Sequence, residues 1–191
     1  MGVLGVVLRW FRDFSGDPSS PTGAELGSAL ALTPLVVKRD TMSETNPTQQ
    51  FSVTAEGETS SRTTVTVRDF EFVVDEPTAV GGTNEGPTPV EYLLGAWAGC
   101  LNLTAHNVAA DRGVEIAGID LALEGDLDPR KFAHGSDEAR AGFQEIRVDV
   151  DVAADDDEEA LDGFAAEVEE RCPVGDNLQQ ATPADVTVDL R

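Results

Sequence analysis

The most constraining feature of this 191-residue sequence is a long segment with few polar side chains, Tyr92–Ala105, which continues to Arg112 and Gly113. It is apolar on nearly all sides, and it is too long for a strand. A glycine directly after such a segment is typical of a helix C-terminus. We therefore expect a helix inside a core, where Gly95 and Gly99 permit another element to approach closely.

Before this helix, apolar and polar residues alternate as they do in strands. Phe51–Ala55 and Thr64–Arg68 flank the polar turn Glu56–Ser61, which predicts a β-hairpin. Phe70–Val74 predicts another strand, and the glycines and proline of 81–87 predict an irregular loop.

After the helix, two further alternating segments, 114–124 and 146–152, predict strands. Residues 155–171 form an amphipathic helical pattern with acidic residues in its first turn, and a short helix is expected to about residue 181. Val186–Leu190 predicts a last strand. This order is typical of an α+β fold with an antiparallel sheet and a buried central helix, and not of a βαβ series.

Residues 1–48 differ from the rest. They combine a short apolar stretch with loop signals such as Gly16–Pro21, and no hydrophobic period is sustained. We expect a disordered or mis-started extension before a single domain over 49–191, and Met42 opens a more conventional N-terminus.

The charge is strongly unbalanced. Thirty-six acidic residues face thirteen basic ones, which gives a formal net charge of −23 at pH 7. Such a surface repels phosphate backbones and anionic lipids, so we expect no nucleic-acid partner and no membrane partner. The acidic residues are spread along the chain, unlike an acidic interaction tail, and salt would screen their repulsion. This pattern favours a halophilic protein.

The beginning of the chain argues against secretion. The apolar stretch Gly2–Leu8 has no basic residues before it and is followed by Arg9 and Arg12, unlike a signal peptide. No apolar run approaches the ~20 residues that span a bilayer. We therefore expect a cytoplasmic protein.

The chain has two cysteines, too few for a disulfide scaffold, so a bond between them would indicate redox chemistry. Cys172 precedes Pro173, which places it at a helix N-cap, where thiol pKa values are lowered. From the residues alone, a reactive thiol and an inert one are equal alternatives at Cys172. Cys100, on the apolar helix, is the weaker candidate because cysteine is often a small buried hydrophobe.

Two motifs carry a resemblance to a known family. Gly86–Cys100 contains a Pro-x-Glu run that leads into a small-residue helix and a cysteine, and Arg171–Val174 contains Cys-Pro-Val. Together, in this order and about seventy residues apart, they resemble the two signatures of the OsmC/Ohr family, the osmotically inducible protein C and organic hydroperoxide resistance proteins. The resemblance covers about residues 50–191.

The resemblance implies an intertwined homodimer with active sites at the subunit interface. It also implies that Cys100 attacks the O–O bond of an organic hydroperoxide and becomes a sulfenic acid. Cys172 would then condense with it to a disulfide, which a dithiol reduces. This thiol chemistry needs no cofactor.

The family's peroxidases also use an arginine from the early hairpin. Arg62 lies at about the matching place and Arg68 is the alternative, although either can be an ordinary exposed strand arginine. The chain departs from the pattern at Val90, where those peroxidases have a glutamate that orients the arginine. Glu91 lies nine residues before Cys100. At ~100° per residue, Glu91 would lie on the opposite face of the helix from Cys100.

We therefore expect a thiol peroxidase that acts on organic hydroperoxides through Cys100, Cys172 and Arg62. The alternative is an OsmC-like protein without peroxidase activity that binds a small apolar ligand between subunits. His106 and His134 have no ligand-like spacing with the cysteines, so we expect no metal site.

Overall fold

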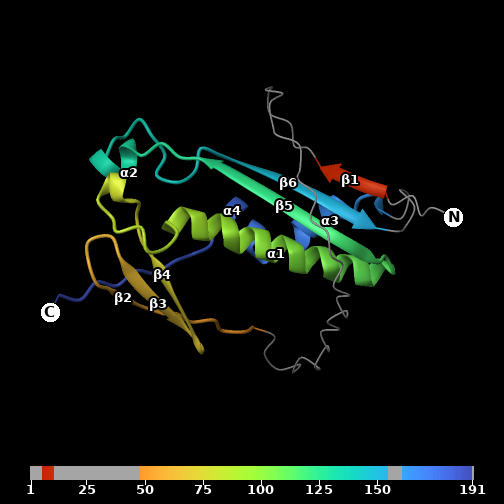
Figure 1. The fold of residues 1–191 in the computed structure, drawn as a ribbon, viewed down its shortest axis with the longest axis horizontal. Helices are drawn as coiled ribbons and strands as arrows, with labels where there is room; N and C mark the ends of the chain where they lie inside the picture. The colour runs from red at the N-terminus through yellow and green to blue at the C-terminus, as the bar shows by residue number, and fades with distance from the viewer. Residues whose placement is uncertain (1–5, 11–47, 155–160, 191) are drawn as a thin grey trace.

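The structure, a computed structural model, describes residues 6–10, 48–154 and 161–190 (Figure 1). Its elements are β1 (Val6–Trp10), β2 (Thr54–Gly57), β3 (Thr63–Val67), β4 (Phe70–Val74), a 3-10 helix (Thr78–Val80), α1 (Pro89–Arg112), β5 (Ile116–Asp126), α2 (Arg130–His134), β6 (Glu145–Ala154), α3 (Phe164–Arg171) and α4 (Pro173–Gln179).

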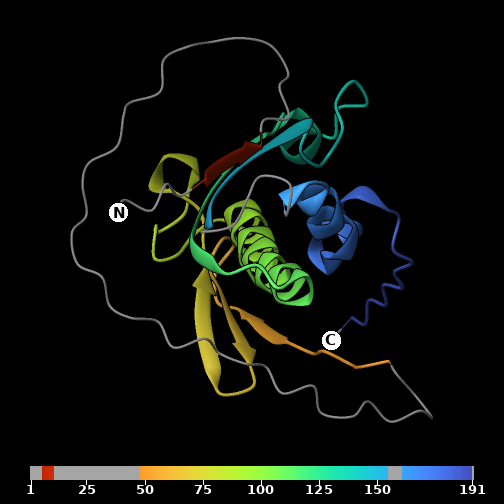
Figure 2. The ribbon, with the colours of Figure 1, turned by 90° about the vertical axis from the view of Figure 1, so that its right-hand side faces the viewer.

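The strands form two antiparallel sheets of three, in the orders β2-β3-β4 and β1-β6-β5. Seen along α1, the two sheets lie on different sides of this helix, and α3 and α4 lie on a third side (Figure 2). α1 packs against β5, α3 and α4. The mixed α+β class and the antiparallel pairing are as predicted.

The small sheet contains the predicted hairpin. β2 pairs with β3 from Thr54 opposite Thr66 to Gly57 opposite Thr63. β3 and β4 are joined by a two-residue turn, since Val67 lies opposite Phe70. Arg68 begins this turn with a φ of 53°, in the left-handed region that such tight hairpin turns require.

In the larger sheet, β5 pairs with β6 along its whole length, with one irregularity between Ile116 and Gly118. The other edge of β6 pairs with β1. β1 belongs to the 1–48 extension, for which we predicted no strand. Residues 11–47 of that extension lie outside the described residues.

α1 ends at the predicted glycine, Gly113, but it begins at Pro89, before the predicted Tyr92. Thr88 is its N-cap in a capping box with Glu91, Pro89 occupies the first turn, and Gly113 ends it with a φ of 73°. No helix in the described ranges is both long and apolar enough to cross a membrane.

In this single chain, α1 is buried along one face only. That face consists of Leu101, Thr104, Ala105, Val108 and Ala109. On the remaining surface Leu103 is 54% exposed, and a Cβ at Gly95 or Gly99 would contact none of the described residues. The expected complete burial of the central helix is therefore not seen within one chain.

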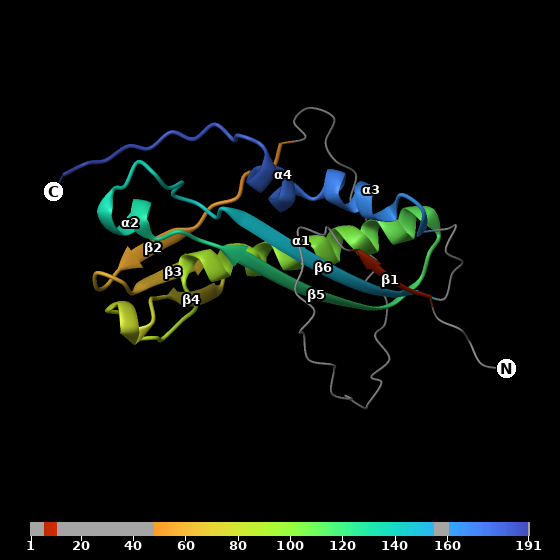
Figure 3. The same cartoon turned by 90° about the horizontal axis from the view of Figure 1, so that it is seen from above.

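Near the C-terminus, one prediction is wrong. Residues 181–190 form no strand but run out from α4 as an extended segment (Figure 3). The predicted alternation is present, but Val186, Val188 and Leu190 are all at least 77% exposed. A strand needs a hydrogen-bonding neighbour, and alternation cannot supply one.

The two C-terminal helices are in place. α4 follows Cys172 as predicted, and α3 is the end of the predicted 155–171 helix. The acidic first turn predicted for that helix falls on 155–160, outside the described residues.

The core lies between α1, β6 and α3. Its largest fully buried side chains include Val108, Val150, Val152, Phe164 and Val168, and the Cys172 side chain belongs to the same cluster.

Candidate active site

The two cysteines, 72 residues apart in sequence, come together in the structure. Both are free thiols, and Sγ of Cys172 lies 3.1 Å from Sγ of Cys100, with the Cys172 thiol as the donor of a hydrogen bond. Cys100 comes from α1, and Cys172 from the junction between α3 and α4. We call these two residues the thiol pair.

Cys172 has the predicted helix-cap geometry. It is the N-cap of α4, Pro173 follows it, and the Gly175 N–H donates to its sulfur at 3.4 Å. Its residue is only 1% exposed, however. Burial raises the pKa of Cys172, as does the adjacent Cys100, and these effects exceed the opposing hydrogen bond from Gly175. The pKa of Cys172 is therefore raised although the residue caps a helix, a position that by itself lowers thiol pKa values.

Cys100 is half-buried and is the more accessible thiol of the pair. It packs against the core together with Trp97, one turn earlier on α1, and Val174. The space beside the sulfurs is small. A Cβ at Gly175 would lie 3.0 Å from Nε1 of Trp97 and 3.5 Å from Sγ of Cys172.

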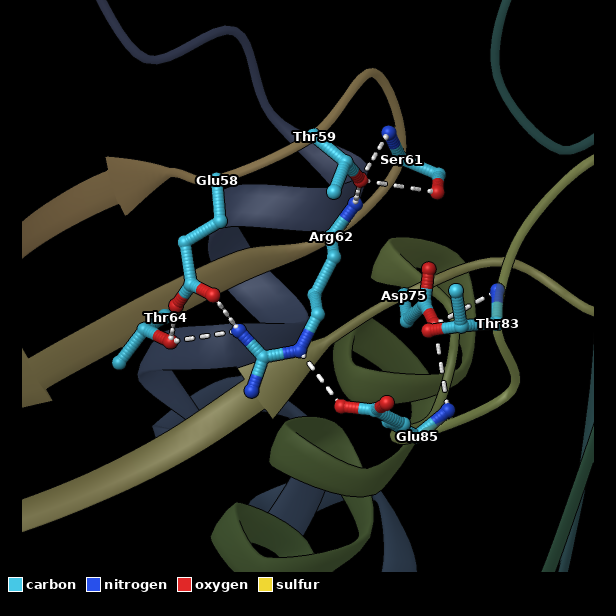
Figure 4. A network of polar contacts seen from close by, with 8 residues as sticks. All are labelled: Glu58, Thr59, Ser61, Arg62, Thr64, Asp75, Thr83 and Glu85. Carbon is cyan, nitrogen blue, oxygen red and sulfur yellow. Dashed lines mark hydrogen bonds and ion pairs between the residues drawn. The ribbon is translucent and has the colours of Figure 1, made fainter.

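Arg62 lies at the end of the β2–β3 turn, in a polar cluster (Figure 4). Its guanidinium lies between two carboxylates: Nε donates to Glu85 at 2.7 Å, and Nη1 pairs with Glu58. Nη1 also donates to the hydroxyl of Thr64 at 3.3 Å. The bonds to the two carboxylates, that to Glu85 first, raise the pKa of Arg62. We call Glu58, Arg62, Thr64 and Glu85 the arginine cluster.

The arginine cluster and the thiol pair are separate in this chain. Among the described residues, the guanidinium partners of Arg62 are two carboxylates and a hydroxyl, and neither sulfur is one of them. Arg68, the alternative arginine, lies in the β3–β4 turn with its guanidinium 5.1 Å from the centre of the Phe70 ring.

Glu85 is the residue that sequence reasoning missed. It lies 23 positions from Arg62, in the loop before α1, and its backbone is held by Asp75 (Figure 4). One carboxylate oxygen of the fully buried Asp75 accepts from the N–H and hydroxyl of Thr83, at 3.0 and 2.6 Å, and from the N–H of Glu85 at 3.1 Å. These bonds, that from the Thr83 hydroxyl first, hold the pKa of Asp75 far below its usual range.

One local signal in the sequence does indicate an ordered loop here. An aspartate at the end of a strand, before a glycine-rich loop, often accepts hydrogen bonds from nearby backbone N–H groups. It does not indicate which side chain the loop presents.

Glu91 is used for a different purpose. Its carboxylate accepts from the Thr88 N–H at 2.7 Å and from the Thr88 hydroxyl at 2.9 Å, which completes the capping box. The pKa of Glu91 is lowered, chiefly by the backbone bond from Thr88. Val90, where a glutamate was expected, is half-buried in the first turn of α1.

An open groove of about 850 Å³ borders this loop and the first two turns of α1. Glu85 and Tyr92 are among its lining residues, and the lining ends on α1 at Ala96. Cys100 lies one helical turn beyond Ala96 on the same side of the helix. In the described ranges, no group of three or more side chains of metal-binding type is placed to hold an ion.

Comparison with known proteins identifies the family. The family model described as "OsmC-like protein" matches residues 82–187. This chain belongs to the OsmC-like family. The matched stretch contains both cysteines of this OsmC-like chain but begins after the hairpin that carries Arg62. No match was found among curated proteins.

Several solved structures have a similar fold. An OsmC-like protein from Mycoplasma pneumoniae is 22% identical, with a TM-score of 0.59 over 70% of this chain and 89% of the other. An organic hydroperoxide resistance protein from Legionella pneumophila is 17% identical, with a TM-score of 0.51 over 69% of this chain and 90% of the other. One from Elizabethkingia anophelis is 14% identical, with a TM-score of 0.53 over 70% of this chain and 91% of the other. At these identities the likeness shows the fold alone.

Proposed function

We propose that this OsmC-like protein is a thiol peroxidase that reduces organic hydroperoxides through Cys100 and Cys172. The observation that carries the proposal is the thiol pair itself, one sulfur half-buried and the other fully buried, 3.1 Å apart. The names of the Legionella and Elizabethkingia proteins, which refer to organic hydroperoxide resistance, support the substrate class.

In the first step, the Cys100 thiolate attacks the terminal oxygen of the hydroperoxide. An S–O bond forms as the O–O bond breaks, and the alkoxide takes up a proton and leaves as the alcohol. Cys100 becomes a sulfenic acid, the reversible stage of cysteine oxidation. Cys100 acts first because it is the accessible thiol, while burial keeps Cys172 protonated.

In the second step, the sulfur of Cys172 attacks the sulfur of the sulfenic acid. An S–S bond forms, the S–O bond breaks, and hydroxide leaves with the Cys172 proton as water. Because the sulfurs are already 3.1 Å apart, this step needs little movement. A dithiol then returns both cysteines to thiols and is itself oxidised to a disulfide.

In this proposal Arg62 interacts with the bound hydroperoxide and not with the resting thiol. Glu85 pairs with Arg62 and also lines the groove that approaches Cys100, so it connects the arginine cluster to the substrate path. In this proposal Glu85 has the orienting role of the glutamate that is absent at Val90. The groove would hold the organic part of the substrate.

We further propose a cytoplasmic, salt-adapted homodimer. The exposed Leu93 and Leu103, together with the open glycines of α1, form a surface against which a second copy could pack. The net charge of −23 supports salt adaptation.

The groove also supports a second function, binding of a small apolar ligand without catalysis. Its lining includes Pro77, Pro87 and Tyr92, and it is open without any movement of the thiol pair.

Turnover of cumene hydroperoxide with dithiothreitol in molar salt distinguishes the two functions. We expect activity in the wild type and none in Cys100→Ser, while Cys172→Ser, treated without dithiothreitol, should consume one equivalent of peroxide and stall as the sulfenic acid. Equal inactivity of the wild type and Cys100→Ser would refute the peroxidase. Saturable binding of an apolar dye, lost in a groove variant such as Ala96→Trp, would then support the ligand-binding function.

A further inference from the structure

Trp97 has a polar group that the resting structure does not use. Its indole nitrogen Nε1 is buried and has no hydrogen-bond partner in the described part of the chain. A buried N–H without a partner costs free energy of desolvation, and a phenylalanine of similar shape would avoid that cost. An unpaired donor of this kind therefore calls for a functional explanation.

This N–H lies beside the thiol pair. Trp97 is three residues before Cys100 on α1, a spacing that places both on one face of the helix. Nε1 of Trp97 and Sγ of Cys172 border the same small space, the one that a Cβ at Gly175 would occupy 3.0 Å from the first and 3.5 Å from the second. The Gly175 N–H already donates to that sulfur.

The resting state does not require a second donor at Cys172, because its thiol keeps its proton and donates it toward Cys100. The situation changes in the resolving step. Cys172 must then lose its proton to attack the sulfenic sulfur, and its negative charge would develop in a buried place where few groups can stabilise it.

We propose that Trp97 is a catalytic residue of the resolving step, whose indole N–H joins the Gly175 N–H in stabilising the Cys172 thiolate. This inference rests on the proposed peroxidase function and adds a residue to it. The side chain moves into the space above Gly175 as charge builds on the sulfur, and the hydrogen bond ends when the S–S bond has formed. No change in the first step is expected, because the donor acts on Cys172.

Trp97→Phe removes the N–H and keeps an aromatic ring. In this variant we expect Cys100 to be oxidised by cumene hydroperoxide at the wild-type rate, and the disulfide to form about tenfold more slowly, as for loss of one hydrogen bond to a charged group. Slower resolution leaves the sulfenic acid exposed to a second peroxide, so the yield of sulfinic acid should rise, which mass spectrometry measures. Thr104→Val, which removes a buried hydroxyl from the same helix, is the matched control and should form little sulfinic acid.

A second measurement does not depend on peroxidase activity. In a Cys100→Ser background Cys172 is the only thiol, and its titration can be followed by the ultraviolet absorbance of the thiolate. Adding Trp97→Phe should raise the Cys172 pKa further.

The inference is overturned if Trp97→Phe leaves the ratio of disulfide to sulfinic acid unchanged, or if it leaves the Cys172 titration unchanged. It is also overturned if Trp97→Phe slows both steps equally and lowers the Tm, which would indicate a structural role. If hydroperoxide does not oxidise Cys100 in the wild type, the proposed function fails. The Cys172 titration then still decides whether Trp97 stabilises that thiolate.

Discussion

The thiol pair and the arginine cluster are both parts of the proposed site, but different forces hold them. Cys172 is 1% exposed and belongs to the apolar cluster that includes Phe164 and Val168. The side chains of Arg62 and Glu85 are 20% and 55% exposed, and charge and hydrogen bonds hold them together. One region depends on packing, and the other on electrostatics.

The difference predicts how each region responds to change. Packing against a core is not weakened by the screening that salt provides, and it defines positions closely. A single exposed ion pair contributes only about 0.2–1 kcal/mol and weakens with salt. The arginine cluster therefore depends on its combined contacts and on Asp75, which holds the backbone of Glu85.

The largest expected effect comes from the packed region. Phe164 is fully buried at the start of α3, the helix that ends at Cys172. Phe164→Ala should lower the free energy of unfolding by about 3–5 kcal/mol. It should also slow disulfide formation, because Cys172 loses its support. Chemical denaturation and peptide mapping after one equivalent of hydroperoxide measure the two effects. An unchanged rate of disulfide formation in a destabilised variant would show that the core does not position Cys172.

The next test concerns the proposed dimer and the exposed face of α1. The N-terminal turns of this helix border the groove, and its middle carries Cys100. In molar salt, light scattering should give about twice the 20.2 kDa of one chain. Leu103→Asp should give a monomer because it places a charge on the exposed apolar face. Val80→Asp, at a valine outside α1 that is even more exposed than Leu103, should remain dimeric. A wild-type monomer would contradict the proposal.

Changes in the arginine cluster should affect rate and spare stability. Glu85→Gln should reduce hydroperoxide turnover by about tenfold, as positioning errors do, with a Tm near that of the wild type. Val90→Glu should bring little gain, because Glu85 already pairs with Arg62. If Val90→Glu raises turnover while Glu85→Gln leaves it unchanged, the orienting role of Glu85 is wrong.

Asp75 links stability to pH in the loop that presents Glu85. Its pKa is depressed in the folded protein, so it stabilises the fold above the ordinary aspartate pKa of about 4, and this contribution is lost as the pH falls below that value. Asp75→Asn should therefore lower the Tm at neutral pH, and the difference from the wild type should shrink in acid. Thermal unfolding at several pH values checks this, and a constant difference would refute it.

Salt should have the smallest effect, acting on the charged surface as a whole. The Tm should rise between low and molar salt because screening relieves repulsion among the excess carboxylates. A Tm that does not change with salt would argue against salt adaptation.

Local patterns in the sequence were sufficient for much of the fold. The capping box, Pro89 and Gly113 define the ends of α1, and Cys172-Pro173 defines the start of α4. The hairpin follows from alternation around a polar turn. Each of these signals involves residues that are neighbours in the chain, and so they are readable from one sequence.

Other features depend on which distant segments meet, and only the tertiary structure decided them. The Arg62–Glu85 pair joins residues 23 positions apart, and the Cys172 pKa rises because the core around it outweighs the effect of its helix. The Val186–Leu190 segment has the alternation of a strand but no partner strand among the residues that the structure describes. Local sequence determined helix ends, turns and the two candidate thiols. Burial, pairing and charge balance came from three-dimensional proximity, because desolvation and hydrogen bonding depend on all the surrounding atoms.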